Sequence, residues 1–216
     1  MRLFLLLFFA VTACQSTPQG DGWIDLTQPS AWRAYKGNSI PAPWVFWNDA
    51  IHLSTGGVGD LVSVETFEAF EFEYEWRISA RGNSGVMFHV TEGDGPTYST
   101  GPEMQVLDNA VFDGDINRKH AAGACYALYE AGQDNTRPVG EWNRARILVQ
   151  EGGHTEFWLN GVQQCAFELG SEDWRQRVAA SKFGEMPSFG VKHSGHLALQ
   201  DHNSPVWYRA LRIRRL

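Results

Sequence analysis

Polar residues that could do chemistry interrupt an otherwise apolar pattern at four places in the chain. They combine carboxylate, amide, imidazole and basic side chains: Arg81, Asn83 and His89 in RGNSGVMFHV; Glu103, Gln105 and Asp108 in GPEMQVLDN; Arg118, Lys119 and His120 in NRKHAAG; and Gln200, Asp201 and His202 in LQDHN. Such groups can act as acids or bases, and those from distant strands could meet around a divalent cation. The chain has no HExxH, paired CxxC, EF-hand, P-loop or Gly-x-Ser-x-Gly motif. Spacing alone therefore shows no metal site and no nucleophile.

Each of these residues also has an ordinary structural explanation. Asn83 lies between glycines and is typical of a turn. Glu103 follows a Gly-Pro pair and could be the solvated start of a strand, and Asp108 could end that strand as an Asx turn. His202 precedes Asn-Ser-Pro, which is typical of a loop, and a core-facing Asp201 would be satisfied by backbone amides.

The elements that must position these residues are mostly strands. FEAFEFEYEWRI, residues 67–78, alternates apolar and polar side chains with the period of a half-buried strand. Gly152-Gly153 predicts a tight hairpin turn between strands at 146–150 and 155–159, and Asn160-Gly161 predicts one between strands at 155–159 and 162–167. Further strands are predicted at 45–47, 51–53, 61–63, 85–90, 104–107, 125–129, 146–150, 155–159, 162–167, 196–202 and 206–213. With one short helix expected at 172–183, the fold class is all-β: an antiparallel two-sheet β-sandwich.

Strand alternation sorts the polar residues onto faces. Glu103 and Gln105 share one face of their strand, and Gln200 and His202 share one face of theirs. Asp201 points the other way, with Leu197 and Leu199. If the leucines face the core, Gln200 and His202 point out of the sandwich.

The N-terminus has the pattern of a secreted lipoprotein. Residues 1–13 have a basic Arg2, an apolar run and a small-residue junction, which predicts a signal peptide. Val11-Thr12-Ala13-Cys14 resembles the bacterial lipobox, so we expect lipidation at Cys14, a linker over 14–22 and one domain over 23–216. Cys14 could instead be an ordinary residue of a cleaved signal. Gln15 after the lipidated cysteine favours the outer membrane and periplasm within the cell envelope.

The charge of the chain limits the classes of binding partner, and its cysteines allow at most one disulfide apart from Cys14. The chain has 18 basic and 25 acidic residues, and removal of Arg2 with the signal leaves 17 and 25, a net charge of about −8. This argues against nucleic acid or anionic lipid as a partner, so membrane contact is expected through the lipid anchor only. Cys125 and Cys165 could form a disulfide or remain buried thiols.

Seven segments together resemble one family. They are, in this order along the chain, GDLVS, FEFEYEWRISARGNSGVMF, TGPEMQVLDN, GEWNRARILV, FWLNGV, VAASKF and GHLALQDHNSPVWYRALRIRRL, and the resemblance runs from about Trp23 to Leu216. The chain thus resembles the bacterial 3-keto-disaccharide (3-keto-glucoside) hydrolase domain family. The resemblance implies a concanavalin-like or laminin-G-like jelly roll and an enzyme that cleaves the glycosidic bond of 3-keto-glucosides or 3-keto-disaccharides.

The implied chemistry assigns roles to the polar residues. A C3 carbonyl acidifies the C2 proton, so a base at C2, a donor for the enolate oxygen and an acid for the leaving oxygen allow elimination, after which water adds. The resemblance implies His202 as base, since imidazole titrates near neutrality, and Glu103 or Asp108 as acid or as ligand to a divalent cation. Gln105 and Gln200 would orient sugar hydroxyls, with Asn83 and His120 at the rim. No cofactor is certain.

Three residues depart from the family pattern. Asn203 stands where the resemblance implies Gly, Ala127 where it implies Asp, and Ala210 where it implies Asn. Loss of a substrate contact at Ala127 or Ala210 would change the substrate range. Two other functions stay open: a non-catalytic, lectin-like carbohydrate-binding module and a conventional glycosidase on the same fold.

Overall fold

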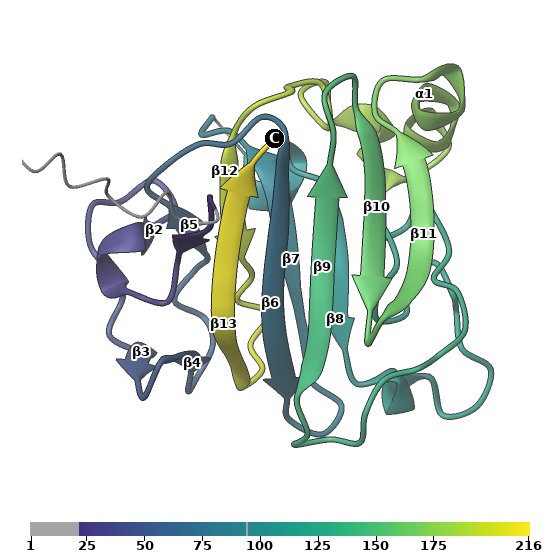
Figure 1. Ribbon diagram of the computed structural model, residues 1–216. Coiled ribbons are helices and arrows are strands. Elements are labelled where there is room, and N and C mark those ends of the chain that lie inside the picture. The colour runs from purple at the N-terminus through teal and green to yellow at the C-terminus, as the bar shows by residue number, and fades with distance from the viewer. Residues whose placement is uncertain (1–21, 94) are drawn as a thin grey trace, which may run out of the picture.

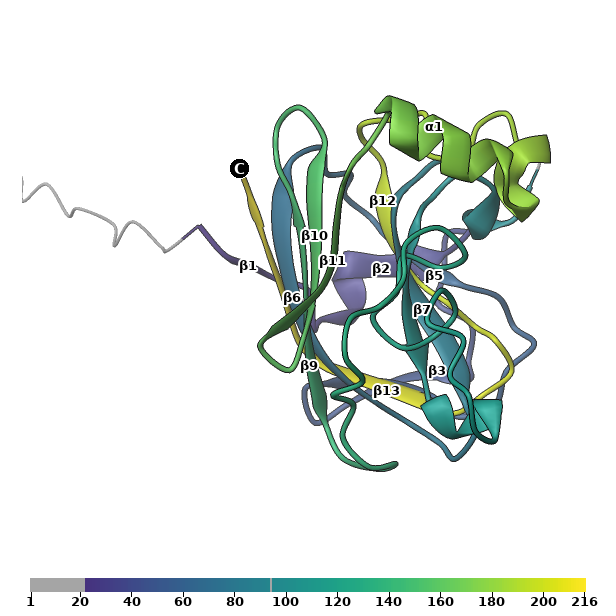
Figure 2. The same ribbon diagram turned by 90° about the vertical axis from the view of Figure 1, so that its right-hand side faces the viewer.

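The computed structural model describes residues 22–93 and 95–216, which form two antiparallel sheets packed face to face (Figures 1 and 2). This confirms the predicted β-sandwich with one short α-helix. The predicted signal peptide 1–13, Cys14 and nearly all of the linker 14–22 lie outside the described residues. Within the described ranges, no helix is both long and apolar enough to cross a membrane.

The larger sheet has the order β11-β10-β9-β6-β13-β4-β3, with β1 also paired to β13. Its strands are β1 (Ile24–Asp25), β3 (Trp44–Trp47), β4 (Ala50–Leu53), β6 (Phe70–Ile78), β9 (Asn143–Val149), β10 (His154–Leu159), β11 (Val162–Glu168) and β13 (Val206–Arg215). In β6 the alternation places Phe72, Tyr74 and Trp76 in the core. The intervening glutamates therefore lie on the outer face, which is the face turned away from the other sheet.

The smaller sheet has the order β2-β5-β12-β7-β8. Its strands are β2 (Trp32–Ala34), β5 (Leu61–Ser63), β7 (Asn83–Val90), β8 (Glu103–Leu107) and β12 (His196–Leu199). Leu197 and Leu199 are fully buried in the main core, as are Val86 and Met104. Residues that alternate with them consequently point away from the core, and this outer face carries the polar side chains described below.

Short helices and turns close the sandwich. Helix α1 (Glu172–Ala179) begins after Ser171, whose hydroxyl accepts a hydrogen bond from the Trp174 amide, and it lies across one end of the two layers (Figure 2). Single 3-10 turns occur at η1 (Pro29–Ala31), η2 (Thr97–Ser99), η3 (Asn109–Phe112) and η4 (Lys182–Glu185). The helix expected over 172–183 is therefore interrupted before η4.

Two strand predictions are wrong in detail. The strand expected at 125–129 is absent, because Cys125 forms isolated bridges with both Met104 and Tyr129 in a tight reversal. The strand expected to continue to His202 ends at Leu199. Both predicted hairpin turns are confirmed, with positive φ at Gly152, Gly153, Asn160 and Gly161. Cys125 and Cys165 are free thiols.

Candidate active site

The outer face of the smaller sheet brings distant polar residues into one row. Gly85 pairs with Gln105 in the neighbouring strand, and the Gln200 amide donates to the Gly85 carbonyl at 2.9 Å. Leu199 pairs with Leu61, so the next residues outward, Gln200 and Asp60, also lie side by side. Adjacent strands are about 4.8 Å apart. The segments around residues 60, 85, 105 and 200 therefore converge, as the sequence predicts for Gln105 and Gln200.

Glu103 is the central acid of this face. It pairs with Met87 in β7, is only 7% exposed, and its side chain lies directly over Gly85. A Cβ atom at residue 85 would lie 2.6 Å from Glu103 Cδ, so glycine leaves the space that the carboxyl group occupies. Within residues 22–93 and 95–216, no hydrogen bond or ion pair reaches this carboxyl group. Burial raises the pKa of Glu103 to about 8, although the positive charge of Lys182 acts to lower it.

Lys182 holds its ammonium group among aromatic rings beside Glu103. Its Nζ atom is 4.3 Å from the ring centroid of Tyr126, 5.1 Å from that of Phe183 and 5.5 Å from that of Tyr98. The residue as a whole is exposed, but partial burial of the ammonium lowers the Lys182 pKa, against the opposing effect of Glu103. The aromatic faces favour a cation at this position.

Three side-chain amides present unused acceptors on the same face. In the described part of the chain, Asn83 Oδ1, Gln105 Oε1 and Gln200 Oε1 are buried and have no hydrogen-bond partner. Gln105 uses its Nε2 to donate to the His120 carbonyl at 3.3 Å. An unpartnered buried acceptor is costly in a folded protein, so three together favour a bound ligand with hydroxyl donors.

His120 forms one wall of the site with Tyr126. Their rings stack with centroids 4.8 Å apart, and the Tyr126 amide donates to the Glu103 carbonyl at 3.0 Å. Asn117 Nδ2 lies 3.1 Å from His120 Nδ1. Burial lowers the pKa of His120, and the charge of Lys182 adds to this effect, which favours neutral imidazole.

Asp60 and Asp201 connect the loop before β5 to the loop after β12. Asp60 accepts hydrogen bonds from the Thr97 hydroxyl and from the Asp201 amide, the latter at 2.7 Å, and burial raises its pKa. The Asp201 carboxylate accepts from the Val58 and Gly59 amides at 2.7 and 3.0 Å. Asp201 therefore has the backbone-binding role expected of it. His202 is exposed in the loop that follows, within electrostatic range of Asp60.

Asp108 is engaged differently from Glu103. Its Oδ1 atom caps η3 by accepting from the Ala110 amide at 3.1 Å, and Oδ2 accepts from the Arg81 amide at 2.6 Å. Both carboxylate oxygens thus bind backbone, which is the Asx-turn explanation. Its assignment as acid or cation ligand stays a prediction, and we do not include Asp108 in the site.

Sequence reasoning missed Asp60, Lys182 and Tyr126. Asp60 and Lys182 lie in GDLVS and VAASKF, which carried the resemblance without an assigned role. Alternation before the buried Leu61 could have placed Asp60 on the outer face. Nothing local predicts that η4 brings Lys182 toward Glu103, because this contact depends on how the chain folds after α1.

We call Asp60, Asn83, Glu103, Gln105, Lys182 and Gln200 the Glu103 site. Among the described residues, no three His, Cys, Asp or Glu side chains are grouped so that they could hold a metal ion. We accordingly route no step through a cation. A groove of about 840 Å³ exists on the outer face of the larger sheet, but none of the six residues lines it. The Glu103 site is distinguished by its chemistry and not by its volume.

The fold and the site define a jelly-roll β-sandwich with a buried carboxyl group on one outer face and an ammonium group in its electrostatic neighbourhood. The chain belongs to the family of 3-keto-alpha-glucoside-1,2-lyase-like domains, whose model matches residues 22–214. It is 31% identical to a 3-keto-disaccharide hydrolase of Bacteroides thetaiotaomicron, over 90% of this chain and 78% of that protein.

Solved structures agree with this fold. A candidate glycosyl hydrolase from Parabacteroides distasonis is 31% identical, with a TM-score of 0.82 over 90% of this chain and 94% of that chain. A carbohydrate-binding module, CBM66 from Bacillus subtilis, is 14% identical, with a TM-score of 0.55 over 85% of this chain and 95% of that chain. The latter similarity shows a shared fold alone.

Proposed function

We propose that this protein cleaves the glycosidic bond of 3-keto-glucosides or 3-keto-disaccharides at the Glu103 site. The observation that carries the proposal is Glu103 itself: a buried carboxyl group with a pKa of about 8 and no hydrogen bond or ion pair among the described residues, within electrostatic range of the Lys182 ammonium and on the same face as three unused amide acceptors. At neutral pH such a carboxyl group is mostly protonated and can donate.

The proposed reaction is an elimination followed by hydration. His202, in the loop near Asp60 at the edge of the Glu103 site, removes the C2 proton. The electron pair of that C–H bond forms a C2–C3 double bond, and the π pair of the carbonyl moves onto the C3 oxygen, where the Lys182 ammonium stabilises the enolate. The enolate then re-forms the carbonyl and a C1–C2 double bond, while the C1–O bond breaks and Glu103 protonates the leaving oxygen. Water adds across the double bond, with oxygen at C1 and hydrogen at C2, which completes net hydrolysis.

The comparisons support both steps of the proposed reaction, the elimination and the hydration. The family name describes a lyase-like domain and the relative is named a hydrolase. An elimination that ends in the addition of water is a lyase reaction at its first step and a hydrolysis in its outcome. Gln105, Gln200 and Asn83 would orient the sugar through their unused oxygens, and His120 would lie at the rim.

The test compares a 3-keto-glucoside with its unoxidised parent in D₂O. We expect cleavage of the keto form only, with deuterium incorporated at C2 of the released 3-keto-glucose. Cleavage of the plain glucoside would indicate a conventional glycosidase, and cleavage of neither would indicate a binding module. Keto-glucoside cleavage without deuterium at C2 would exclude the elimination.

Variants then test the residues. His202→Ala and Glu103→Gln should each lower kcat/KM by roughly 10²- to 10⁴-fold, the range typical of a lost general acid or base. Glu151→Gln is the matched control, because Glu151 is exposed in the β9–β10 turn. A near-normal rate in either variant, with the fold intact, would remove that residue from the mechanism.

We also propose that Cys14 is lipidated and that the protein faces the periplasm from the outer membrane. The lipobox-like VTAC sequence supports this. Expression in a bacterial host should yield a protein that partitions with membranes, whereas Cys14→Ser should abolish lipid incorporation. A Cys14→Ser protein that still acquires lipid would contradict the proposal.

A further inference from the structure

The tryptophans of this chain are distributed unevenly between the two sheets. Trp32, Trp44, Trp76 and Trp174 are buried in the core. The five that are partly or fully exposed, Trp23, Trp47, Trp142, Trp158 and Trp207, all lie along the larger sheet. Register places Trp207 and Trp158 on its outer face, since they pair with Arg77 and Arg146, and Trp142 and Trp23 contact the arginines of the same face. This face is opposite to the one that carries the Glu103 site.

Arginine side chains lie over four of these five indoles, those of Trp23, Trp142, Trp158 and Trp207. Arg209 Cζ lies 4.1 Å from the ring centroid of Trp142, Arg212 Cζ lies 4.5 Å from that of Trp23, and Arg146 Cζ lies 5.6 Å from that of Trp158. The same arginines are fixed by glutamates of β6: Arg209 binds Glu75 at 2.7 Å and Arg212 binds Glu73 at 2.6 Å. Planar groups held this way form a preorganised surface.

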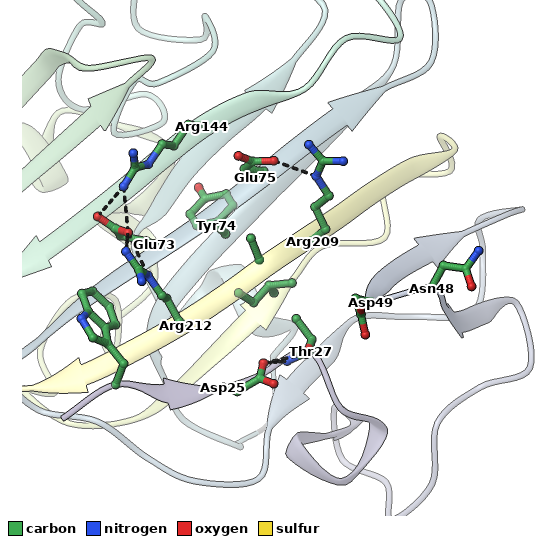
Figure 3. A pocket seen from close by; sticks show the side chains of 13 residues that line it. Asp25, Thr27, Asn48, Asp49, Glu73, Tyr74, Glu75, Arg144, Arg209 and Arg212 are labelled. Carbon is green, nitrogen blue, oxygen red and sulfur yellow. Dashed lines mark hydrogen bonds and ion pairs between the residues drawn. The ribbon is translucent and has the colours of Figure 1, made fainter. Parts of the chain in front are cut away.

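Two grooves run side by side across this surface. One of about 840 Å³ includes Trp23 and Arg212, and one of about 500 Å³ includes Trp142 and Trp158. Both are lined by Glu73, Glu75 and Arg144, so they adjoin at β6. Figure 3 shows Glu73 between Arg144 and Arg212, with Asp25 and Asp49 on the far side of the first groove.

A break in β13 hollows the floor of the first groove. The register between β13 and β6 shifts between Arg209 and Arg212, which is a β-bulge. Ala210 lies in this bulge with a positive φ of 51° and lines the groove with a methyl group only. A small residue with a strained backbone in the lining of a polar groove fits a binding surface better than a plain solvated sheet.

We propose that these two grooves form a second binding site, for a neutral oligosaccharide. Their lining contains four carboxylates and five guanidinium groups, so the net charge is close to zero. Mixed donors and acceptors with indoles at both ends match a linear chain of hydroxyl-rich rings. They do not match a polyanion or an anionic membrane, which would need an excess of positive charge. The span from Trp23 to Trp158 crosses several strands, at about 4.8 Å each.

Isothermal titration calorimetry measures binding of the protein to three linear hexasaccharides. These are an α-1,4-linked glucose hexamer, a β-1,4-linked glucose hexamer and a β-1,4-linked mannose hexamer. We expect saturable binding to at least one of them, weakened at least tenfold in Trp142→Ala and in Trp158→Ala. Trp47→Ala is the matched control, because Trp47 is 72% exposed on the same face but lines neither groove. Circular dichroism would confirm that each variant is folded.

Turnover of a 3-keto-glucoside separates this proposal from the proposed function. Glu103→Gln should lose turnover and keep hexaose binding, and Trp142→Ala should do the opposite. No binding to any of the three hexaoses would overturn the proposal, as would equal binding by wild type and Trp142→Ala. It would also be overturned by tighter binding to a hexagalacturonate or to phosphatidylglycerol vesicles, or by dimerisation that Trp142→Ala abolishes.

Discussion

Replacement of Glu103 by Gln should change the pH dependence of stability, since the carboxyl group has a pKa of about 8 in the folded protein and an ordinary value of 4.5 when exposed. Between these values the folded state binds the proton and the unfolded state releases it. The free energy of unfolding of the wild type therefore falls as pH rises through this window. A difference of this size corresponds to about 5 kcal/mol at most, because each pH unit contributes about 1.4 kcal/mol.

Glu103→Gln keeps the shape and removes the titration. We expect the stability of the variant relative to wild type to increase steadily from pH 4.5 to pH 8, by several kcal/mol, and to stay level above that. Urea unfolding followed by tryptophan fluorescence at pH 5, 7 and 9 measures this difference. Only the change with pH matters, because any fixed cost of the new amide is present at every pH.

Parallel curves of the free energy of unfolding against pH for wild type and Glu103→Gln would contradict this prediction. If wild type and Glu103→Gln lose the same stability between pH 5 and 9, the Glu103 carboxyl group is not held protonated by burial. Glu151→Gln should run parallel to wild type, since Glu151 is exposed. If that control diverges as Glu103→Gln does, the effect comes from overall charge and not from the Glu103 site.

Three further predictions test the site and the backbone. Lys182→Met should lower kcat/KM on a 3-keto-glucoside by roughly 10²- to 10³-fold with little change in KM, because in the proposed mechanism the ammonium stabilises the enolate; an equal rise in KM alone would assign it to substrate binding. Gly85→Ala should displace the Glu103 carboxyl group and lower activity, whereas Gly93→Ala, which has open space around its Cβ, should not. Ala127→Asn and Ala210→Asn should each raise the free energy of unfolding by about 0.5–1 kcal/mol, because both alanines have positive φ; unchanged or lower melting temperatures would contradict this.

Local alternation was enough to predict most of the sandwich. FEFEYEWRI determines which face of β6 is buried, and Asn160-Gly161 determines the hairpin that follows, because both depend on neighbours in sequence. The strand expected at 125–129 failed because its apolar residues are buried by a tight reversal and not by a ladder. Apolar runs report burial, and burial alone does not distinguish these two structures.

The site was predictable only in part. Glu103, Gln105 and Gln200 belong to strands whose alternation fixes the outward direction, and the structure brings them together. Lys182 could not be placed, because its position depends on the path of the chain after α1. All three departures from the family pattern, Ala127, Asn203 and Ala210, have positive φ. Asp, Asn and Gly suit that conformation, so backbone geometry explains these positions without a lost substrate contact.

The unused oxygens of Asn83, Gln105 and Gln200 also affect the stability of the protein when no ligand is bound. A buried acceptor without a partner destabilises the empty fold by about 1–3 kcal/mol, so this face is less robust than an apolar surface of the same shape would be. Occupancy reverses that deficit: a ligand present at a hundred times its Kd adds about 2.7 kcal/mol to the folded state. Resistance to heat and proteolysis should consequently rise whenever the sugar is abundant. A mutant selected only for stability would tend to replace these amides by methionine or leucine and, if the proposed function holds, lose its activity.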